Sequence, residues 1–387
     1  MTYKGRLMLL VTSPSALLVK GTVDSSIAQV LKEAVADGHI VGVVSNQAKP
    51  DWFDNVFQGT GVEFAQSIGR GDGEIVRETA KNKGLAPQDV LVLAASRDDI
   101  AMGKNGNAVL VAAAWSNKPR ISELGIQVDS PASLREILHL TSEWDGKWWF
   151  SAKGSYYGVH ALADLSTMGQ GKGYDLKQFR SQLKTTIKTG GPRLNALLAM
   201  TARSMLTQGI NTVPNLMWGV FPSSDSTNTD TEVLSDFTRR LRTTVSNVRM
   251  ARRGQPLFIR HRASTKRSTS GSKIDRLDPR EQIETIHLNP AYANNVAGRN
   301  VIVIDDCTTY GVSFGVAAGL LYKAGAQSVT CVALGKFGGL LEEFQVEITG
   351  DPFKPLSYDK EAILHHRNPL FGSENSSSQA VLKGLLS

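Results

Sequence analysis

Two adjacent acids end a run of four apolar residues, and a loop rich in hydroxyl groups follows them. The segment is VIVIDDCTTYGVS, with carboxylates at Asp305 and Asp306 and a predicted loop from Cys307 to Ser313. Ionised carboxylates only accept hydrogen bonds, so sugar hydroxyls are suitable partners for them. Residues 314–321 have a helical pattern, and the free N–H groups at a helix N-terminus favour an anion. The segment therefore predicts a site for a phosphorylated sugar.

The predicted loop offers hydroxyl and backbone N–H groups to a phosphate. Gly311 permits a backbone turn that other residues resist. A Mg²⁺ ion bridging a polyphosphate would offset the charge of the two carboxylates. The alternative is a plain strand–turn–helix in which the aspartates cap the turn, although a buried acid pair is costly without a partner. The predicted phosphate ligands are Thr308, Thr309, Tyr310, Gly311, Val312 and Ser313.

The segment is similar to the phosphoribosyl-pyrophosphate signature of type I phosphoribosyltransferases. Four apolar residues, two acids, two variable residues, Thr309, a variable residue, Gly311, a variable residue and a hydroxyl residue follow in the family's order. The resemblance implies that Asp305 and Asp306 are the catalytic pair, binding the ribose hydroxyls and holding Mg²⁺ indirectly through the ligand. Tyr310 departs from the family pattern, because a small residue is usual there.

Two further segments fit the parts of that family that bind pyrophosphate. The stretch GVFPSSDS places Ser223 and Ser224 in a turn after a predicted strand. The stretch RHRASTKRSTSGSK is a predicted mobile loop, and its basic residues are Arg260, Arg262, Lys266, Arg267 and Lys273. The layout most resembles the competence-factor type of the family. It implies a glycosyltransferase of nucleotide metabolism that uses phosphoribosyl pyrophosphate and Mg²⁺, with an unidentified acceptor.

Basic residues concentrate in one segment. Residues 239–280 contain 13 Lys and Arg against 2 Asp and Glu, in a chain whose formal net charge is +7. The segment is a pyrophosphate-binding loop, a surface for a nucleic-acid backbone, or a solvated face. Phe258 is its only aromatic residue, which argues against a groove that stacks bases. The alternatives to a transferase are therefore a sensor of nucleotides or phosphoribosyl compounds and a regulatory protein associated with nucleic acid.

Predicted strands and helices alternate through the first 120 residues, which indicates a parallel sheet with helices on both faces. The runs LMLLV, HIVGVVSN and DVLVLAAS are similar to those of haloacid-dehalogenase-like hydrolases, with an unrelated α/β domain as the alternative. Thr12–Ala16 lacks the nucleophilic carboxylate of that family, Ser45 matches its second motif, and Arg70 stands where a lysine is expected. Of the metal-binding acids only Asp98 or Asp99 survives. A phosphoaspartyl mechanism needs the missing carboxylates, so we expect the fold without hydrolysis.

The length of 387 residues accommodates two domains. We expect an α/β protein with two parallel-sheet domains: residues 1–125 as a Rossmannoid hydrolase-like domain, 145–345 as a phosphoribosyltransferase domain, and 346–387 as a partly loose tail. The first domain would serve as scaffold, dimerisation unit or sensor, so a homodimer is one expected state. Two cysteines suit a reducing compartment. Because no apolar run approaches membrane length, we expect a cytoplasmic protein without a membrane partner.

Overall fold

The computed structural model describes residues 5–116, 118–121, 123–166, 174–229, 231–245, 254–265 and 275–386. The chain divides into two compact units that are each built from several segments. Unit 1 comprises Met1–Lys147, Gly191–Thr212 and Arg239–Ala251. Unit 2 comprises Trp148–Gly190, Val213–Thr238 and Arg252–Ser387.

Unit 1 is built on a six-stranded sheet in the order β5-β4-β1-β6-β7-β8, with every pairing parallel. Every residue of β1, β6 and β7 is buried, as expected for central strands of a sheet covered on both faces. The strands are β1 (Leu9–Thr12), β4 (Ile40–Ser45), β5 (Glu63–Gln66), β6 (Val90–Ala94), β7 (Val109–Ala113) and β8 (Ile126–Val128), with a small hairpin of β2 (Leu18–Val19) and β3 (Thr22–Val23).

The helices of unit 1 have clear local signals at their N-termini. Asp24 accepts hydrogen bonds from two N–H groups of α2, and Ser130 accepts one from α6, which also begins with a proline. The helices are α1 (Pro14–Leu17), α2 (Ser25–Ala36), α3 (Trp52–Phe57), α4 (Glu74–Asn82), α5 (Arg97–Asn105), α6 (Pro131–Glu143) and α8 (Pro192–Thr207). The chain of α9 (Val233–Val245) begins in unit 2, and from Arg239 on it is grouped with unit 1.

Unit 2 is built on a second six-stranded sheet in the order β11-β14-β15-β10-β9-β18. The first four strands are parallel to their neighbours, whereas β9 and β18 run antiparallel. The strands are β9 (Phe150–Lys153), β10 (Gly158–Asp164), β11 (Leu216–Val220), β14 (Asn300–Thr308), β15 (Ser328–Lys336) and β18 (Ser373–Glu374). Two separate antiparallel pairs accompany the sheet: β12 (Phe258–Arg260) with β13 (Ile286–Leu288), and β16 (Glu342–Ile348) with β17 (Ala362–Pro369).

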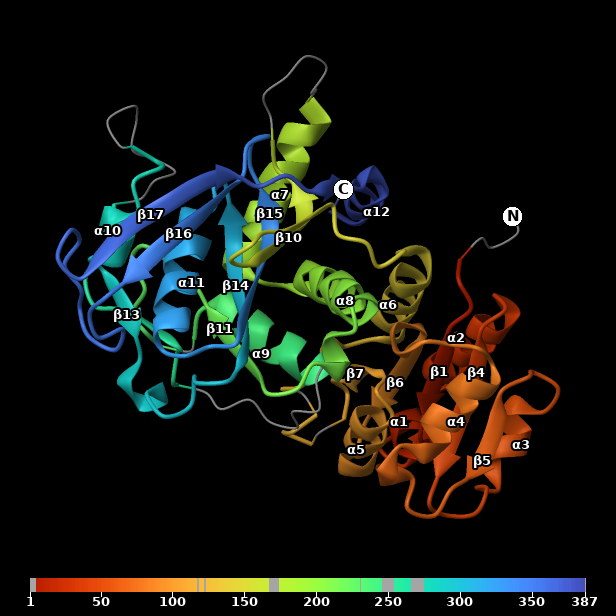
Figure 1. The fold of residues 1–387 in the computed structure, drawn as a ribbon. Helices are drawn as coiled ribbons and strands as arrows, with labels where there is room; N and C mark the ends of the chain where they lie inside the picture. The colour runs from red at the N-terminus through yellow and green to blue at the C-terminus, as the bar shows by residue number, and fades with distance from the viewer. Residues whose placement is uncertain are drawn as a thin grey trace. The chain divides into compact units, whose positions relative to one another are not determined.

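Helix α11 (Val312–Lys323) packs between the sheet of unit 2 and the hairpin of β16 and β17 (Figure 1). Two glycines allow this close approach. A Cβ atom on Gly315 would lie 2.3 Å from the Cβ of Phe344, and one on Gly319 would lie 2.6 Å from the carbonyl oxygen of Val346. The remaining helices of the unit are α7 (Tyr174–Thr189), α10 (Arg280–Ile283) and α12 (Ser376–Leu386). The buried core of unit 2 therefore includes α11, the central strands and the hairpin.

The α/β class expected from the sequence is confirmed, and the first sheet is parallel throughout. The second sheet is mixed, so the expectation of two parallel sheets is corrected for unit 2. The compact units also differ from the expected ranges, since α8 and residues from Arg239 to Ala251 are grouped with unit 1. Residues 346–387, expected to be partly loose, include β17, β18 and α12 and belong to unit 2.

Candidate functional site

The carboxyl ends of three parallel strands meet at one edge of the unit 2 sheet. β14 lies between β11 and β15. Directly after β11, the N–H group of Phe221 donates to the carbonyl of Ile304 at 2.8 Å. Directly after β15, the N–H group of Phe337 donates to the carbonyl of Thr308 at 2.8 Å. Ligands of open α/β sheets bind at such an edge, so the carboxyl end of β14 is the candidate site.

Asp305 and Asp306 lie within β14 rather than at the start of a loop. We expected the loop to begin at Cys307, but β14 continues to Thr308. The reason is tertiary, because Cys307 and Thr308 pair in register with the last two residues of β15. The sequence expectation of a long hydroxyl-rich loop is therefore corrected to a turn of three residues, 309–311.

Backbone amides hold the two carboxylates in place. The N–H group of Asp306 donates to Asp305 Oδ1 at 2.8 Å, and that of Cys307 donates to Asp306 Oδ1 at 2.6 Å. Asp305 is only 8% exposed, and burial, followed by the negative charge of Asp306, raises the pKa of Asp305 well above its ordinary value of 3.8. The described residues form no ion pair with either aspartate. Two neighbouring carboxyl groups without a cation favour a ligand that brings hydrogen-bond donors or positive charge.

The turn after β14 leads directly into α11. Gly311 has a φ of +98°, which residues with a side chain rarely adopt, and a Cβ there would lie 2.5 Å from the carbonyl oxygen of Glu342. No side chain of the described residues caps α11, so N–H groups of its first turn remain available to an anion. The predicted phosphate ligands divide by exposure: Thr309, Tyr310 and Ser313 are partly exposed, whereas Thr308, Gly311 and Val312 are buried.

Tyr310, the departure from the family pattern, takes part in packing. Its carbonyl accepts a hydrogen bond from the N–H group of Glu342 at 2.9 Å, and its ring packs against the core of unit 2. The start of β16 thus covers one side of the turn. This hydrogen bond joins Tyr310 to the hairpin of β16 and β17. The sequence analysis did not predict that this hairpin lies near the turn.

A second turn, with Ser223 and Ser224, follows β11 beside the aspartates. Ser223 is exposed, and the carbonyl of Ser224 accepts a hydrogen bond from the N–H group of Ser264 at 2.9 Å. The guanidinium group of Arg260 donates to the carbonyl of Pro222 at 3.1 Å. The structure therefore brings together the serine turn and residues 260–264 of the basic segment.

Arg260 differs from its predicted role. We expected a mobile ligand of pyrophosphate, but its side chain is 4% exposed and donates to Gln282 Oε1 at 3.0 Å and to Thr285 Oγ1 at 2.8 Å. Its positive charge acts to lower the pKa of Asp305, although less than burial raises it. Arg260 is therefore a buried positioning residue whose charge offsets part of the acid pair.

The other predicted basic ligands are only partly placed. Arg262 lies 3.6 Å from Glu284, with both side chains at least partly exposed. Lys266 and Arg267 lie outside the described residues, as does Lys273. The pyrophosphate-binding role of these basic residues stays a prediction.

The basic segment is not one continuous exposed surface. Arg239 and Arg240 are 8% and 5% exposed and are grouped with unit 1. Arg240 donates to the carbonyl of Gly125 at 3.1 Å, so it supports the packing of unit 1. These two arginines therefore add little exposed charge to the segment, and their burial cannot be read from composition.

Lys336, at the end of β15 opposite Thr308 of β14, was not singled out from the sequence. It is buried, and its Nζ donates to the carbonyl of Gly338 at 2.5 Å and lies over the rings of Trp149 and Phe150. Burial lowers its pKa, while the charges of two acids raise it. A lysine that ends a buried strand and precedes Phe337 and two glycines was the available signal.

The corresponding edge of unit 1 contains a buried and paired acid. Asp99 is fully buried, and its carboxylate accepts hydrogen bonds from the hydroxyl of Ser13 at 3.0 Å and the N–H group of Ala95 at 2.9 Å. The guanidinium group of Arg70, itself 5% exposed, forms an ion pair with the same carboxylate. The surviving acid is therefore neutralised by a side chain of the protein.

The other predicted motif residues of unit 1 also have internal partners. The hydroxyl of Thr12, where a nucleophilic carboxylate was missing, donates to the carbonyl of Leu93 at 3.1 Å. Ser45 Oγ accepts from the N–H group of Gln47 at 3.0 Å. Asp98 lies on the outside and accepts from an exposed asparagine. Of the two adjacent acids, Asp99 is buried and Asp98 is exposed.

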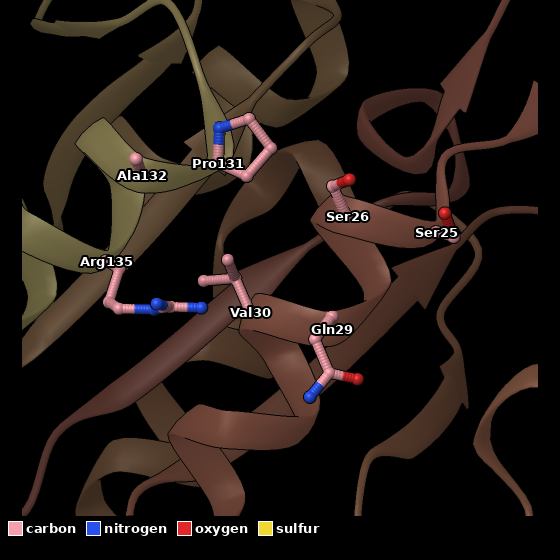
Figure 2. Close-up of a pocket in the computed structure, with 7 residues that line it drawn as sticks. All are labelled: Ser25, Ser26, Gln29, Val30, Pro131, Ala132 and Arg135. Carbon is pink, nitrogen blue, oxygen red and sulfur yellow. The ribbon is translucent and has the colours of Figure 1, made fainter.

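A pocket of about 470 Å³ lies between α2 and α6 of unit 1 (Figure 2). The guanidinium group of Arg135 lies beside it and forms an ion pair with Glu33 of α2. None of the predicted site residues line this pocket. Its lining comprises Ser25, Ser26, Gln29, Val30, Pro131, Ala132 and Arg135.

In the part of the chain that the structure describes, no three His, Cys, Asp or Glu side chains form a group that could hold a metal ion. No helix among the described residues is long and apolar enough to cross a membrane.

Comparison with known proteins identifies no family. No family model and no curated protein matches the chain. Among solved structures, the chain is similar to a HAD family hydrolase from Streptomyces avermitilis, with 14% identity, 32% of this chain and 92% of that chain covered, and a TM-score of 0.24. It is also similar to the dehydrogenase Cj0485, with 10% identity, 79% and 72% of the two chains covered, and a TM-score of 0.18. Neither likeness is close enough to indicate a function.

Proposed function

We propose that unit 2 is a phosphoribosyltransferase-type site that binds phosphoribosyl pyrophosphate with Mg²⁺ and transfers the phosphoribosyl group to an acceptor. One observation carries the proposal. An acid pair without an ion-pair partner among the described residues lies near the carboxyl end of β14, and α11 begins without a side-chain cap after the three-residue turn that follows the strand. Acceptors for sugar hydroxyls and donors for a phosphate therefore stand side by side.

Each part of the ligand has a partner in this arrangement. Asp305 and Asp306 would accept hydrogen bonds from the 2′ and 3′ hydroxyls of the ribose. The 5′-phosphate would bind the partly exposed turn and the first N–H groups of α11. The diphosphate would lie toward β11, where Arg260 and Ser264 of the basic segment contact the Ser223 turn.

The acid pair suits Mg²⁺ only together with the ligand. This ion is commonly held by one or two carboxylates, substrate phosphates and water. Asp305 and Asp306 would hold it through the bound sugar diphosphate, where its charge would offset that of the leaving group. The residues of the chain itself would orient the sugar and its phosphate. Holding the reactants in the reactive geometry would accelerate the transfer.

The reaction would exchange one bond at C1 of the ribose. The bond from C1 to the diphosphate oxygen breaks, and its electron pair leaves with the diphosphate. A lone pair of the acceptor forms the new bond to C1, and a proton that the acceptor loses passes to water. The carboxyl groups of Asp305 and Asp306 would lie beside the sugar, where negative charge would favour the positive charge that develops on its ring.

Titration calorimetry with phosphoribosyl pyrophosphate and Mg²⁺ tests the proposal on the full chain. We expect binding by the wild type, and strong loss in Asp305→Asn and Asp306→Asn. Asp54→Asn, an exposed acid of unit 1 paired with Lys49, is the matched control and should bind like wild type. Equal binding by the wild type and both variants, or no binding at all, would contradict the proposal.

A sensor of phosphoribosyl compounds is the second candidate, and Tyr310 is the observation that favours it. A bulky residue stands where the related enzymes have a small one, and its carbonyl is tied to β16. Release of diphosphate, measured with a panel of nucleobases, separates the two candidates. Tight binding without release by the wild type, but with release by Tyr310→Ala, would assign the tyrosine a role in preventing turnover.

For unit 1 we propose a hydrolase-like fold that does not hydrolyse phosphate esters. The ion pair of Arg70 with Asp99 supports this, because the buried acid already has a cation and the position of the nucleophile holds Thr12. A Mg²⁺-dependent phosphatase assay on the full chain tests it. Turnover that is lost in Thr12→Val would contradict the proposal.

A further inference from the structure

Three cations form a row along one face of α7. Arg180, Lys184 and Lys188 are spaced four residues apart, so they lie on the same side of the helix. The residue before each of them is buried, and these are Phe179, Leu183 and Ile187. The buried stripe holds the helix in unit 2, while Arg180 and Lys184 are partly exposed and Lys188 is exposed. We call these three residues the α7 row.

The α7 row borders the end of β14. The guanidinium carbon of Arg180 lies 4.6 Å from the centre of the Phe337 ring, and Lys184 Nζ lies 5.9 Å from it. Phe337 is firmly placed, because its N–H group donates to the carbonyl of Thr308 and the preceding Lys336 holds the glycine turn behind it. The row therefore lies on the β15 side of the acid pair.

Lys184 and Lys188 bring positive charge to the edge of the sheet that carries the two aspartates. The charges of Lys184 and Lys188 act to lower the pKa of Cys307, which follows the acid pair, although burial and the two aspartates raise it further. Neither lysine forms an ion pair with a described residue. Lysines and carboxylates that share an edge without pairing among the described residues are costly to bring together unless a ligand takes up both charges.

The sheet order assigns the two sides of the site. β11, with the serine turn proposed for the diphosphate, is the neighbour of β14 on one side, and β15 is its neighbour on the other. An acceptor approaches C1 from the side opposite the leaving diphosphate. The α7 row and Phe337 lie on that opposite side, so they are placed to meet the acceptor rather than the leaving group.

We propose that the α7 row, with Phe337 as a flat neighbour, binds an oxyanion, a carboxylate or a phosphate, on a planar acceptor. This inference rests on the proposed function of unit 2 and names the class of its second substrate. Lysine and arginine bind carboxylates and phosphates through charge-assisted hydrogen bonds, and the ring of Phe337 offers an aromatic contact.

Calorimetry on the full chain with saturating ribose 5-phosphate tests the row with matched acceptors. The probes are nicotinate against nicotinamide and uracil-6-carboxylate against uracil, which differ in the carboxylate, and inorganic phosphate against neutral glycerol. We expect the wild type to prefer at least one anionic member of these pairs by about 10- to 100-fold. Preference for the carboxylates or for phosphate identifies the source of the oxyanion. No preference in any pair would overturn the inference.

Variants locate the effect. Lys184→Gln combined with Lys188→Gln should abolish the preference while binding of phosphoribosyl pyrophosphate stays within about threefold of wild type. Lys354→Gln, a control lysine that is 75% exposed, should change neither. If the double variant lost affinity for phosphoribosyl pyrophosphate as strongly as it lost the preference for anionic acceptors, the row would bind the diphosphate and the inference would be wrong. An unchanged preference in the double variant, or salt-sensitive binding of an oligonucleotide in place of the small anions, would also overturn the inference.

The two proposals fail separately. Loss of sugar-phosphate binding in Asp305→Asn tests the first, while the preference among acceptors tests the second.

Discussion

Replacing Asp305 with asparagine should stabilise the folded chain and weaken its ligand. Burial, and then the charge of Asp306, raises the pKa of Asp305 well above 3.8, so the folded state holds this proton more tightly than the unfolded chain. The stabilising contribution of the group is therefore complete below pH 3.8 and is lost as the pH rises through the raised pKa. Asparagine carries no charge, so the variant avoids this loss at neutral pH.

The magnitude follows from burial. A poorly compensated buried polar group costs about 1–3 kcal/mol, and more when it is charged. We therefore expect Asp305→Asn to gain at least about 1 kcal/mol at pH 7.5, which raises Tm by about 2–4 °C per kcal/mol in a unit of this size. The lost charge-assisted hydrogen bond to a ribose hydroxyl would cost about 1.5–3 kcal/mol, or about 10- to 150-fold in affinity.

Urea titrations of the wild type and Asp305→Asn between pH 4 and pH 8 measure the first effect, and calorimetry measures the second. The difference in unfolding free energy should widen as the pH rises. Asp306→Asn serves as the comparison, because Asp306 is more exposed and should gain less. Parallel pH curves, or a variant less stable than wild type at pH 7.5, would refute the reasoning about the acid pair.

Three further predictions concern packing and charge. Gly315→Ala should destabilise by about 1–3 kcal/mol in urea titration, because its Cβ would lie 2.3 Å from a side chain of β16, whereas Gly339→Ala has open space and should change little. Arg70→Ala should cost about 3–5 kcal/mol by leaving the buried charge of Asp99 unpaired, and a second change of Asp99 to Asn should recover part of it. Burial lowers the pKa of His160 from 6.5 to about 4, so stability should fall by about 3 kcal/mol as the pH drops through this range, while His160→Gln should show a flatter pH curve.

Local patterns were sufficient for the strand, turn and helix around the acid pair. An apolar run before Asp305, a glycine at 311 and small apolar residues after it predict these elements without knowledge of neighbours. The end of the strand was missed, because β14 is extended to Thr308 by pairing with β15. Strand length at a sheet edge depends on the partner strand, which lies about 28 residues further along the chain.

Side chains were harder to assign than elements. Arg260 and Arg240 looked like members of one basic surface, yet both are buried and hold carbonyl groups. The tail also appeared loose, although β17 pairs with β16 and residues of β16 meet the glycines of α11. Charge in a sequence does not reveal burial, because a buried cation needs partners that come from other segments.

The sequence by itself determined the α/β class, the acid pair and the turn before a helix, since apolar periodicity, glycine and adjacent carboxylates act over a few residues. Only the tertiary structure decided which groups meet there. The order β11-β14-β15 places the serine turn on one side of the acid pair and Phe337 with the α7 row on the other. These segments are far apart in the chain, and the hydrogen bonding of parallel strands is the physical interaction that brings their ends to one edge.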